Sequence, residues 1–370
     1  FKKISTGHAA LIAGLLLALN LGHLFFSQSV RYYTALAFFQ TVCIWAYLIA
    51  VREKSYGYLA FGLAMFILSL LTHFSALLLA PVFVAHAVYL LLPWSEPGQG
   101  VKRMSWIFVG LLCLILLAFT PSFVELTHRF SGAGYPAGRD PVHILVTFVA
   151  YLGLPVFALG LLGMAFDLRK LDATRVFIAL ASAVPLAEIV VIGLLDLVNV
   201  CWYYVLFSFV FWCLMAGQVL EDLVRTRHNW LAPLLLFICI LFSASFLALY
   251  NTSMHGDRPR WEEAVLDLRQ RVSPADVQQG RVRIYASAPG VVAHYLGFDP
   301  AQTGRIDTVS YPHACPPEKK RASATWYVMR KEHYLTLRCR EWLDENCIRV
   351  AAYPAHTGPV DRTITLYRRK

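Results

Sequence analysis

Runs of apolar side chains about as long as a membrane is thick constrain this chain more than any other feature. The hydrocarbon core of a bilayer measures about 30 Å, and a helix needs about 20 predominantly apolar residues to cross it. Nine segments reach or approach that length, so the sequence predicts a polytopic α-helical membrane protein of about nine spans. The expected spans are Ala9 to Phe26, Tyr33 to Ala50, Tyr56 to Thr72, Phe74 to Leu92, Met104 to Pro121, His143 to Phe166, Thr174 to Leu197, Val200 to Leu220 and Leu231 to Leu249.

Polar residues interrupt two of these apolar stretches. Asn20 and His23 fall inside the first one, which we expect either to cross the membrane or to form a broken, partly interfacial helix. Thr72 and His73 divide the long stretch from 56 to 92, which we interpret as a tight hairpin of two spans.

The composition of the chain changes near Tyr250. Over the whole chain 58% of residues are hydrophobic and 15% are charged, whereas an ordinary soluble domain carries about 25% charged residues. Residues 1–250 hold 14 Lys and Arg and 10 Asp and Glu, and residues 251–370 hold 19 and 13. We therefore predict a membrane domain over 1–250 and a polar domain over 251–370 that is long enough to bury its own core.

The polar domain alternates helix and strand patterns, which is typical of a small α/β layer fold. Helices are predicted at Pro259 to Val272, Gly290 to Leu296 and Glu332 to Asn346. Strands are predicted at Arg281 to Ala286, Ile306 to Val309, Thr325 to Met329, Ile348 to Tyr353 and Arg362 to Tyr367.

Lys and Arg in the loops predict the orientation, because cytoplasmic loops of membrane proteins are enriched in both. With nine alternating spans and a cytoplasmic start, the inner segments carry eleven of these residues and the outer loops carry three, Arg31, Arg129 and Arg139. We therefore expect a multi-pass protein of a bacterial inner membrane, with membrane lipids around it and residues 251–370 in the periplasm. Because this bias explains the basic residues before 250, and no nucleic-acid-binding motif accompanies them, we expect no nucleic-acid partner.

The outward segment Ser27 to Tyr33 holds the first candidate site. The guanidinium of Arg31 offers a planar set of donors that suits phosphate oxygens, and Tyr32 suits the headgroup layer. One interpretation is an interfacial anchor, and the other is a site for the phosphate of a lipid carrier. The second outward segment, Ser122 to Val142, is a long loop with Arg129, Arg139 and Asp140, and loops of this length are often functional.

Three titratable residues have open interpretations. His73 is either a satisfied turn residue or part of a site. Glu188 lies near the middle of a predicted span, where an ionisable group is costly and is either functional or held by a structural hydrogen bond. Asp140 either forms a salt bridge with its neighbour Arg139 or does acid/base work.

Cysteine and motif patterns add little. One disulfide among Cys315, Cys339 and Cys347 is compatible with an oxidising compartment. No Cys or His spacing typical of a zinc site occurs, so we assign no metal ligands. The nucleotide-binding and common hydrolase motifs are absent from the sequence, so we expect no nucleotide cofactor.

Three stretches resemble a known family. They are S-Q-S-V-R-Y-Y (Ser27 to Tyr33) at the start of a span, L-T-H-F (Leu71 to Phe74) at the end of a later span, and R-P-R-W-E-E-A-V-L-D-L (Arg258 to Leu268) after the last span. Together they look like bacterial proteins of glycosyltransferase family 39. These are polytopic GT-C enzymes related to protein O-mannosyltransferases and to aminoarabinose transferases of lipid A.

The resemblance implies transfer of a sugar from a polyprenyl-phosphate carrier to a lipid, glycan or protein acceptor at the outer face of the membrane. In that family an acidic motif in the first outward loop supplies the base and often helps to hold a divalent metal. No such loop precedes Ala9, so we expect the base to lie before Phe1 and the membrane domain to be incomplete at its N-terminus. Arg31 is carried over as the donor-phosphate residue. Arg129 and Arg139 are further cations for the leaving phosphate.

Two other classes of function fit the sequence. A transporter or flippase of lipid-linked or small solutes would use Glu188, although the sequence shows no inverted repeats or paired broken helices. A non-catalytic membrane scaffold would use the polar domain to bind partners.

Overall fold

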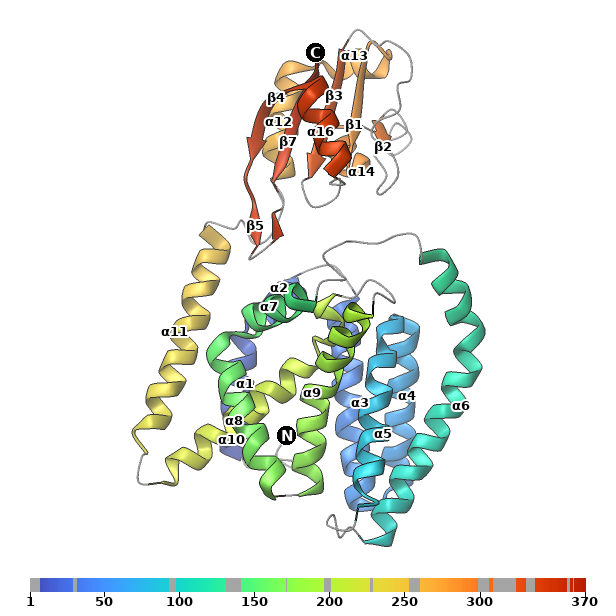
Figure 1. The fold of residues 1–370 in the computed structure, drawn as a ribbon, viewed down its shortest axis with the longest axis vertical. Coiled ribbons are helices and arrows are strands. Elements are labelled where there is room, and N and C mark those ends of the chain that lie inside the picture. The colour runs from blue at the N-terminus through green and yellow to red at the C-terminus, as the bar shows by residue number, and fades with distance from the viewer. Residues whose placement is uncertain are drawn as a thin grey trace. The chain divides into compact units, whose positions relative to one another are not determined.

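The computed structural model divides the chain into two compact units, residues 1–246 and 247–370, and each is described by itself (Figure 1). The described residues are 7–28, 32–92, 98–130, 141–170, 172–195, 201–226, 229–252, 260–298, 306–308, 324–330, 337–357, 360–361 and 363–370.

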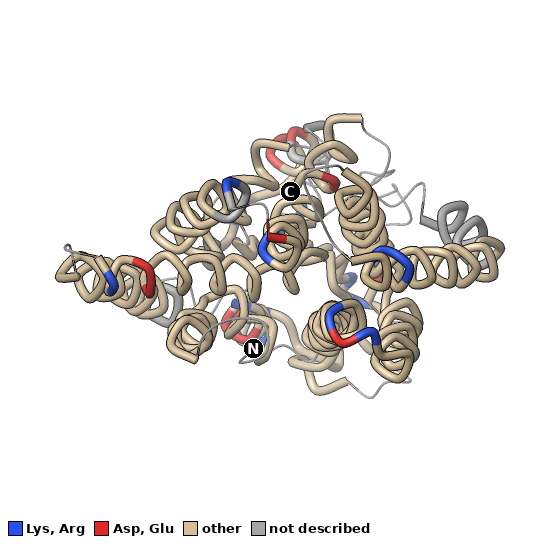
Figure 2. The backbone as a smooth tube through the Cα atoms, turned by 90° about the horizontal axis from the view of Figure 1, so that it is seen from below, with Lys and Arg blue, Asp and Glu red and all other residues tan. Residues whose placement is uncertain are grey.

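The chain before residue 253 is helical throughout its described part, and the helices are apolar. Each predicted span coincides with one helix or with two consecutive ones. They are α1 (Gly7–Ala18), α2 (Leu21–Gln28), α3 (Tyr33–Glu53), α4 (Tyr56–Thr72), η1 (Phe74–Leu79), α5 (Ala80–Tyr89), α6 (Gln99–Phe130), α7 (Pro141–Leu152), α8 (Leu154–Lys170), α9 (Ala173–Leu194), η4 (Trp202–Val205), α10 (Ser208–Val224) and α11 (Leu231–Thr252). Figure 2 shows that Lys, Arg, Asp and Glu occupy few positions along these helices.

Fewer helices than predicted are long enough to cross a bilayer. Within the described residues, four helices are long and apolar enough, or up to six if each of two bent pairs is one span. The four are in α3, α6, α9 and α11, and the pairs are α1 with α2 and α7 with α8, bent by 62° and 99°. The chain thus has the helices of a multi-pass membrane protein, and the count of nine spans is not confirmed.

Asn20 joins the two bent pairs. Its Oδ1 accepts a hydrogen bond of 2.9 Å from the His23 amide and so caps the start of α2. Its Nδ2 donates bonds of 3.0 and 2.8 Å to the carbonyls of Tyr151 and Leu152, the last two residues of α7. Gly153 follows at φ +94°, and Pro155 has no N–H for the Tyr151 carbonyl. The broken first helix was one of the two predicted forms of that segment. The break at Gly153 was not predicted.

Two predicted segments differ from the structure. The span predicted at Met104 to Pro121 corresponds to the apolar segment Gln99–Pro121, but helix α6 continues beyond it to Phe130, because a proline removes only one helix hydrogen bond and membrane helices tolerate that loss. The long outward loop predicted from Ser122 is therefore helical for its first nine residues, and 131–140 lie outside the described part. The span expected to start at Val200 starts as α10 at Ser208, because the 3-10 turn η4 precedes it.

The interior of the helical unit is centred on α10, in which 12 of 17 residues are buried. Its neighbours α1 and α8 approach closely because small residues lie at both contacts. A Cβ at Gly217 of α10 would lie 2.6 Å from the Ala9 carbonyl oxygen of α1. A Cβ at Gly160 of α8 would lie 2.5 Å from a ring carbon of Trp212.

The turns between helices form two groups, as alternating spans require. In the first group, Tyr33 at the start of α3 contacts His73, which precedes η1, and Tyr203, which lies in η4. These three segments were predicted to face outward or to begin a span at the outer face. In the other group, the Nε2 of His86 donates a bond of 3.2 Å to the carbonyl of Ala173, which joins the end of α5 to the start of α9. Which group faces the cytoplasm stays a prediction.

The second unit is an α/β layer fold, and every predicted strand and helix has a counterpart in it. A five-stranded sheet has the order β2-β1-β3-β7-β4, in which β1 pairs in parallel with β2 and β3, and β7 pairs antiparallel with β3 and β4. Two hydrophobic clusters lie against it, one with α12 and α14 and the other with α16. The elements are α12 (Trp261–Arg271), α13 (Pro274–Gln278), β1 (Val282–Ala286), α14 (Pro289–Leu296), β2 (Ile306–Thr308), β3 (Ala324–Arg330), α16 (Leu337–Asn346), β4 (Cys347–Tyr353), β5 (His356–Thr357), β6 (Val360–Asp361) and β7 (Ile364–Arg369).

The predicted disulfide receives no support from Cys347, which is a buried free thiol. Cys315 and the side chain of Cys339 lie outside the described residues.

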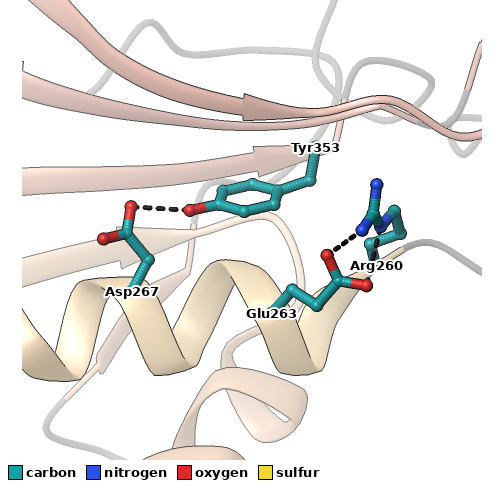
Figure 3. A network of polar contacts seen from close by, with 4 residues as sticks. All are labelled: Arg260, Glu263, Asp267 and Tyr353. Atoms are coloured by element: carbon teal, nitrogen blue, oxygen red, sulfur yellow. Dashed lines mark hydrogen bonds and ion pairs between the residues drawn. The ribbon is translucent and has the colours of Figure 1, made fainter.

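Polar contacts along α12 tie this helix to strand β4 (Figure 3). The Tyr353 hydroxyl donates a bond of 2.6 Å to Asp267, which also accepts a bond of 2.9 Å from Arg271. Partial burial opposes ionisation of Asp267, but the bonds from Tyr353 and Arg271 outweigh it and lower the pKa of this carboxyl. Burial and the bond to Asp267 raise the pKa of Tyr353 to about 12. One turn earlier, Arg260 pairs with Glu263.

We predict that Asn20→Leu lowers the free energy of unfolding by about 2–4 kcal/mol, because one cap is lost and two buried carbonyls lose their donor. Thermal unfolding of the purified full chain in detergent, followed by circular dichroism, measures the change. Thr120→Ala is the control, since the exposed Thr120 hydroxyl donates to the Leu116 carbonyl of its own helix and to no other described residue. Equal shifts for the two variants would contradict the role assigned to Asn20.

We predict that Tyr353→Phe weakens the attachment of α12 by about 1–2 kcal/mol at pH 7, because a bond to an ionised acceptor is lost. Since the pKa of Asp267 is lowered by folding, the contribution of the ionised form is present above about pH 4 and is lost as the pH falls through the lower folded-state value. Hydrogen exchange of the α12 amides should therefore be faster in the variant at pH 7, and the difference should shrink below pH 4.

The control for this measurement is Tyr295→Phe on α14, whose hydroxyl makes no hydrogen bond within the described part of the unit. A difference for Tyr353→Phe that persists unchanged at low pH would contradict the involvement of the Asp267 carboxylate.

Candidate functional site

Five ring-bearing side chains gather where three turns of the helical unit meet, and we call them the aromatic cluster. Tyr32 and Tyr33 start α3, His73 lies between α4 and η1, and Tyr203 and Tyr204 lie in η4. The helix breaks around them are local: His73 ends α4 in extended backbone, and Cys201 enters η4 in the same way. The cluster thus forms from sequence segments about 40 and 130 residues apart, as the residue numbers show.

The rings of the cluster are in direct contact. His73 stacks on Tyr32 with 4.9 Å between ring centroids and 16° between ring planes, and lies 5.2 Å from Tyr204. Tyr33 packs against Tyr203 at 4.6 Å, and its hydroxyl lies 3.0 Å from that of Tyr32. Tyr33 is buried, whereas 44% of the surface of Tyr32 is exposed. The cluster therefore has one face inside the bundle and one face that a ligand can reach.

The hydrogen bonds of His73 define its protonation. The Ser75 amide donates a bond of 3.1 Å to Nδ1, and the Ser75 hydroxyl lies 2.8 Å from the same nitrogen. An amide N–H can only donate, so Nδ1 carries no proton and the ring proton is on Nε2. Burial lowers the pKa of His73 to about 4, in agreement with a neutral ring at physiological pH.

The structure brings two of the predicted site residues together, Tyr32 and His73. Arg31 precedes Tyr32 in the sequence and lies outside the described residues. Arg129 is the penultimate residue of α6, and its side chain is outside the described part. Arg139 and Asp140 are outside it as well. The roles predicted for these four residues therefore stay predictions.

Glu188 lies on α9, six residues before the helix ends, which is about 9 Å along the axis. Both of its carboxylate oxygens are buried and have no hydrogen-bond partner within the described residues, so no hydrogen bond joins Glu188 to the aromatic cluster there. A buried carboxyl without a partner is destabilising. It is the kind of residue that membrane proteins keep for a function, and no structural bond is found for it in the described part.

A second buried polar group, at the other end of the helices, is bonded internally. The Tyr47 hydroxyl lies 2.8 Å from the Nδ1 of His86 and 3.1 Å from the Ser105 hydroxyl. These bonds join α3, α5 and α6. Because His86 also bonds to Ala173, both ring nitrogens are used, and this group is structural.

Sequence reasoning missed Tyr203 and Tyr204, which were assigned to the first turn of a span. A signal existed in the sequence: Tyr32-Tyr33 and Tyr203-Tyr204 are paired tyrosines at the ends of apolar runs, where aromatic side chains are enriched. The contact between the pairs depends on the tertiary fold. Among the described residues, no group of three or more His, Cys, Asp or Glu could hold a metal ion, so the divalent metal stays untested.

Comparison with known proteins gives little. No family model matches the chain, and no curated protein matches it either. Among solved structures, the chain is similar to an oligosaccharyltransferase of Archaeoglobus fulgidus in its apo form, with 14% sequence identity and a TM-score of 0.41. The similarity covers 85% of this chain and 48% of that protein, so the chain spans about half of its length. A TM-score this low assigns neither a fold family nor an activity.

We predict that Glu188→Leu leaves the free energy of unfolding unchanged or raises it by about 1–3 kcal/mol, because the variant removes a buried carboxyl that lacks a partner in the described part. Thermal unfolding of the full chain measures this change, with Glu188→Gln as the control that keeps the shape. A loss of more than about 2 kcal/mol in Glu188→Leu would contradict the prediction, since it would reveal a bonded partner.

Proposed function

We propose that this protein transfers a sugar from a polyprenyl-phosphate donor to a lipid, glycan or protein acceptor at the outer face of a bacterial inner membrane, as a GT-C enzyme related to glycosyltransferase family 39. One observation carries the proposal: Arg31 adjoins Tyr32, which stacks on His73 at a junction of apolar helices. In this proposal residues 251–370 lie in the periplasm.

The chemistry of this junction suits a lipid phosphate. A lipid carrier can reach the ends of membrane helices from the bilayer, which leaves its phosphate and sugar at the interface. Arg31 supplies a permanent positive charge with several donors, and such groups stabilise a phosphate as it leaves. The exposed ring of Tyr32 offers an apolar face and a hydroxyl to the headgroup.

The rest of the machinery is assigned by residue type. A carboxylate must deprotonate the acceptor, and Asp140 is the candidate in this sequence. Arg129 and Arg139 are proposed to assist the leaving phosphate. A divalent metal, where it takes part, would bind the same acidic groups. No nucleotide is needed, because the carrier already bears the activated sugar.

We predict that Arg31→Ala weakens binding of radiolabelled polyprenyl phosphate at least tenfold and lowers sugar transfer accordingly, because a charge-assisted contact to the phosphate is lost. The protein is purified as the full chain and assayed in phosphatidylcholine nanodiscs, with unlabelled polyprenol as a competitor that should have no effect. Arg31→Lys should lie between wild type and Arg31→Ala, since lysine keeps the charge but loses the planar set of donors.

Arg103→Ala is the control, because Arg103 is an exposed cation near the first turn of α6, in the other group of turns. Unchanged binding and transfer in Arg31→Ala would overturn the assigned phosphate site.

One observation favours a transporter as the second candidate. Paired broken helices are not evident in the sequence, but the structure has two bent pairs, and substrate sites of transporters are often built from such helices. Flux of a lipid-linked or small solute into vesicles, without a covalent product and dependent on Glu188, would decide for the transporter. A labelled covalent product would decide for the transferase.

A further inference from the structure

His73 has one ring nitrogen that the fold uses and one that it does not. Nδ1 accepts the Ser75 amide and thereby caps the 3-10 helix η1. Nε2 makes no hydrogen bond with any residue of the described part. Because Nδ1 is an acceptor, Nε2 bears the proton and is a donor that no described residue engages.

The cap alone does not require a histidine. Serine, asparagine, aspartate and threonine are the usual residues at the start of a helix, and each has a side-chain oxygen that accepts the amide. A histidine performs the same task and adds a donor on the far side of its ring. That ring is held in place by Tyr32 on one face and by contacts with Phe74 at 4.3 Å and Tyr204 at 5.2 Å.

The surroundings of the Nε2–H of His73 would strengthen a hydrogen bond from it to an anion. His73 and Tyr33 are shielded from water to a large extent, and a hydrogen bond to an ionised acceptor is stronger in such a medium than in bulk water. His73 is neutral, so it adds a directed donor and no second charge. The adjoining Arg31 is the fixed cation of the proposed site.

We infer that His73 is a binding residue for the phosphate of the lipid donor, that its Nε2–H donates a hydrogen bond to a phosphate oxygen, and that Ser75 fixes the ring in the tautomer that makes this possible. The inference rests on the proposed function and deepens it. It assigns the proton-bearing nitrogen, and it predicts that the phosphate binds without protonation of the histidine.

Two substitutions separate the cap from the donor. Asparagine has an oxygen attached to Cγ, as histidine has Nδ1, so His73→Asn keeps the cap and loses the distal donor. Glutamine places an amide nitrogen at the position of Nε2, so His73→Gln keeps a donor there and loses the cap acceptor. We expect His73→Asn to weaken polyprenyl-phosphate binding about tenfold at an unchanged unfolding temperature. We expect His73→Gln to bind within about threefold of wild type and to unfold at a lower temperature.

Ser75→Ala is the matched control. This variant removes the hydroxyl but keeps the backbone amide that holds Nδ1 as an acceptor, so the affinity for polyprenyl phosphate should stay near that of wild type. The inference is overturned if His73→Asn binds polyprenyl phosphate as tightly as wild type does. It is also overturned if His73→Gln weakens this binding about tenfold. A purely structural histidine would give the reverse order of the two variants.

The same assay separates this inference from the proposed function. If wild type binds polyprenyl phosphate no better than polyprenol, the proposed function fails and the inference fails with it. If Arg31→Ala weakens binding while His73→Asn does not, only the inference fails. Inorganic phosphate tests whether the site requires the lipid. If inorganic phosphate displaced radiolabelled polyprenyl phosphate as well as the unlabelled lipid does at the same concentration, the assignment of a lipid-linked phosphate as the ligand would be wrong.

Discussion

The side-chain amide of Asn20 is the contact on which the candidate site depends. By capping α2 it fixes the direction of the chain up to Phe26, whose carbonyl accepts a bond of 2.7 Å from the Thr34 hydroxyl at the start of α3. By bonding to the end of α7 it holds Tyr151, which stacks on Trp202 of η4 at 4.2 Å. The first series of contacts leads to Tyr33, next to Thr34, and the second leads to Tyr203, next to Trp202. The position of the aromatic cluster therefore depends on the two helix breaks.

The physical reason for this dependence is the cost of free backbone groups in an apolar medium. A helix that bends sharply leaves carbonyls without amide partners, and inside a membrane protein another protein group must bond to them. One asparagine meets this need for two helices at once, because it offers two donors and one acceptor. Close packing of α10 against α1 and α8 is a second condition for this fold. Gly217 and Gly160 allow it, because a side chain at either position would collide with the neighbouring helix.

The part of this fold that could be predicted from the sequence is the part that depends on local pattern. Alternating patterns located the five strands of the main sheet in the second unit, but not the short strands β5 and β6. The polar residues Asn20 and His73 marked true breaks in helices. Gly153 and Pro155 are a local signal for the break between α7 and α8. The side chain that bonds to the freed carbonyl of Leu152, however, is Asn20, 132 positions away. For the site, Tyr32 and His73 were chosen one by one from their chemistry. Their stacking, and the addition of Tyr203 and Tyr204, required the arrangement of segments far apart in sequence.

The helix breaks also bear on which of the two candidate functions the fold favours. In transporters, the ends of broken helices bind ions or substrate because their backbone groups are open to a ligand. Here the last two carbonyls of α7 already accept hydrogen bonds from Asn20, so the fold satisfies these backbone groups without an ion. Within the described residues, the open polar group at this junction is on a side chain instead, the Nε2–H of His73. An N–H donor of this kind suits an anion better than a cation, so the described part of this junction lacks the cation-binding backbone groups on which the transporter hypothesis would depend.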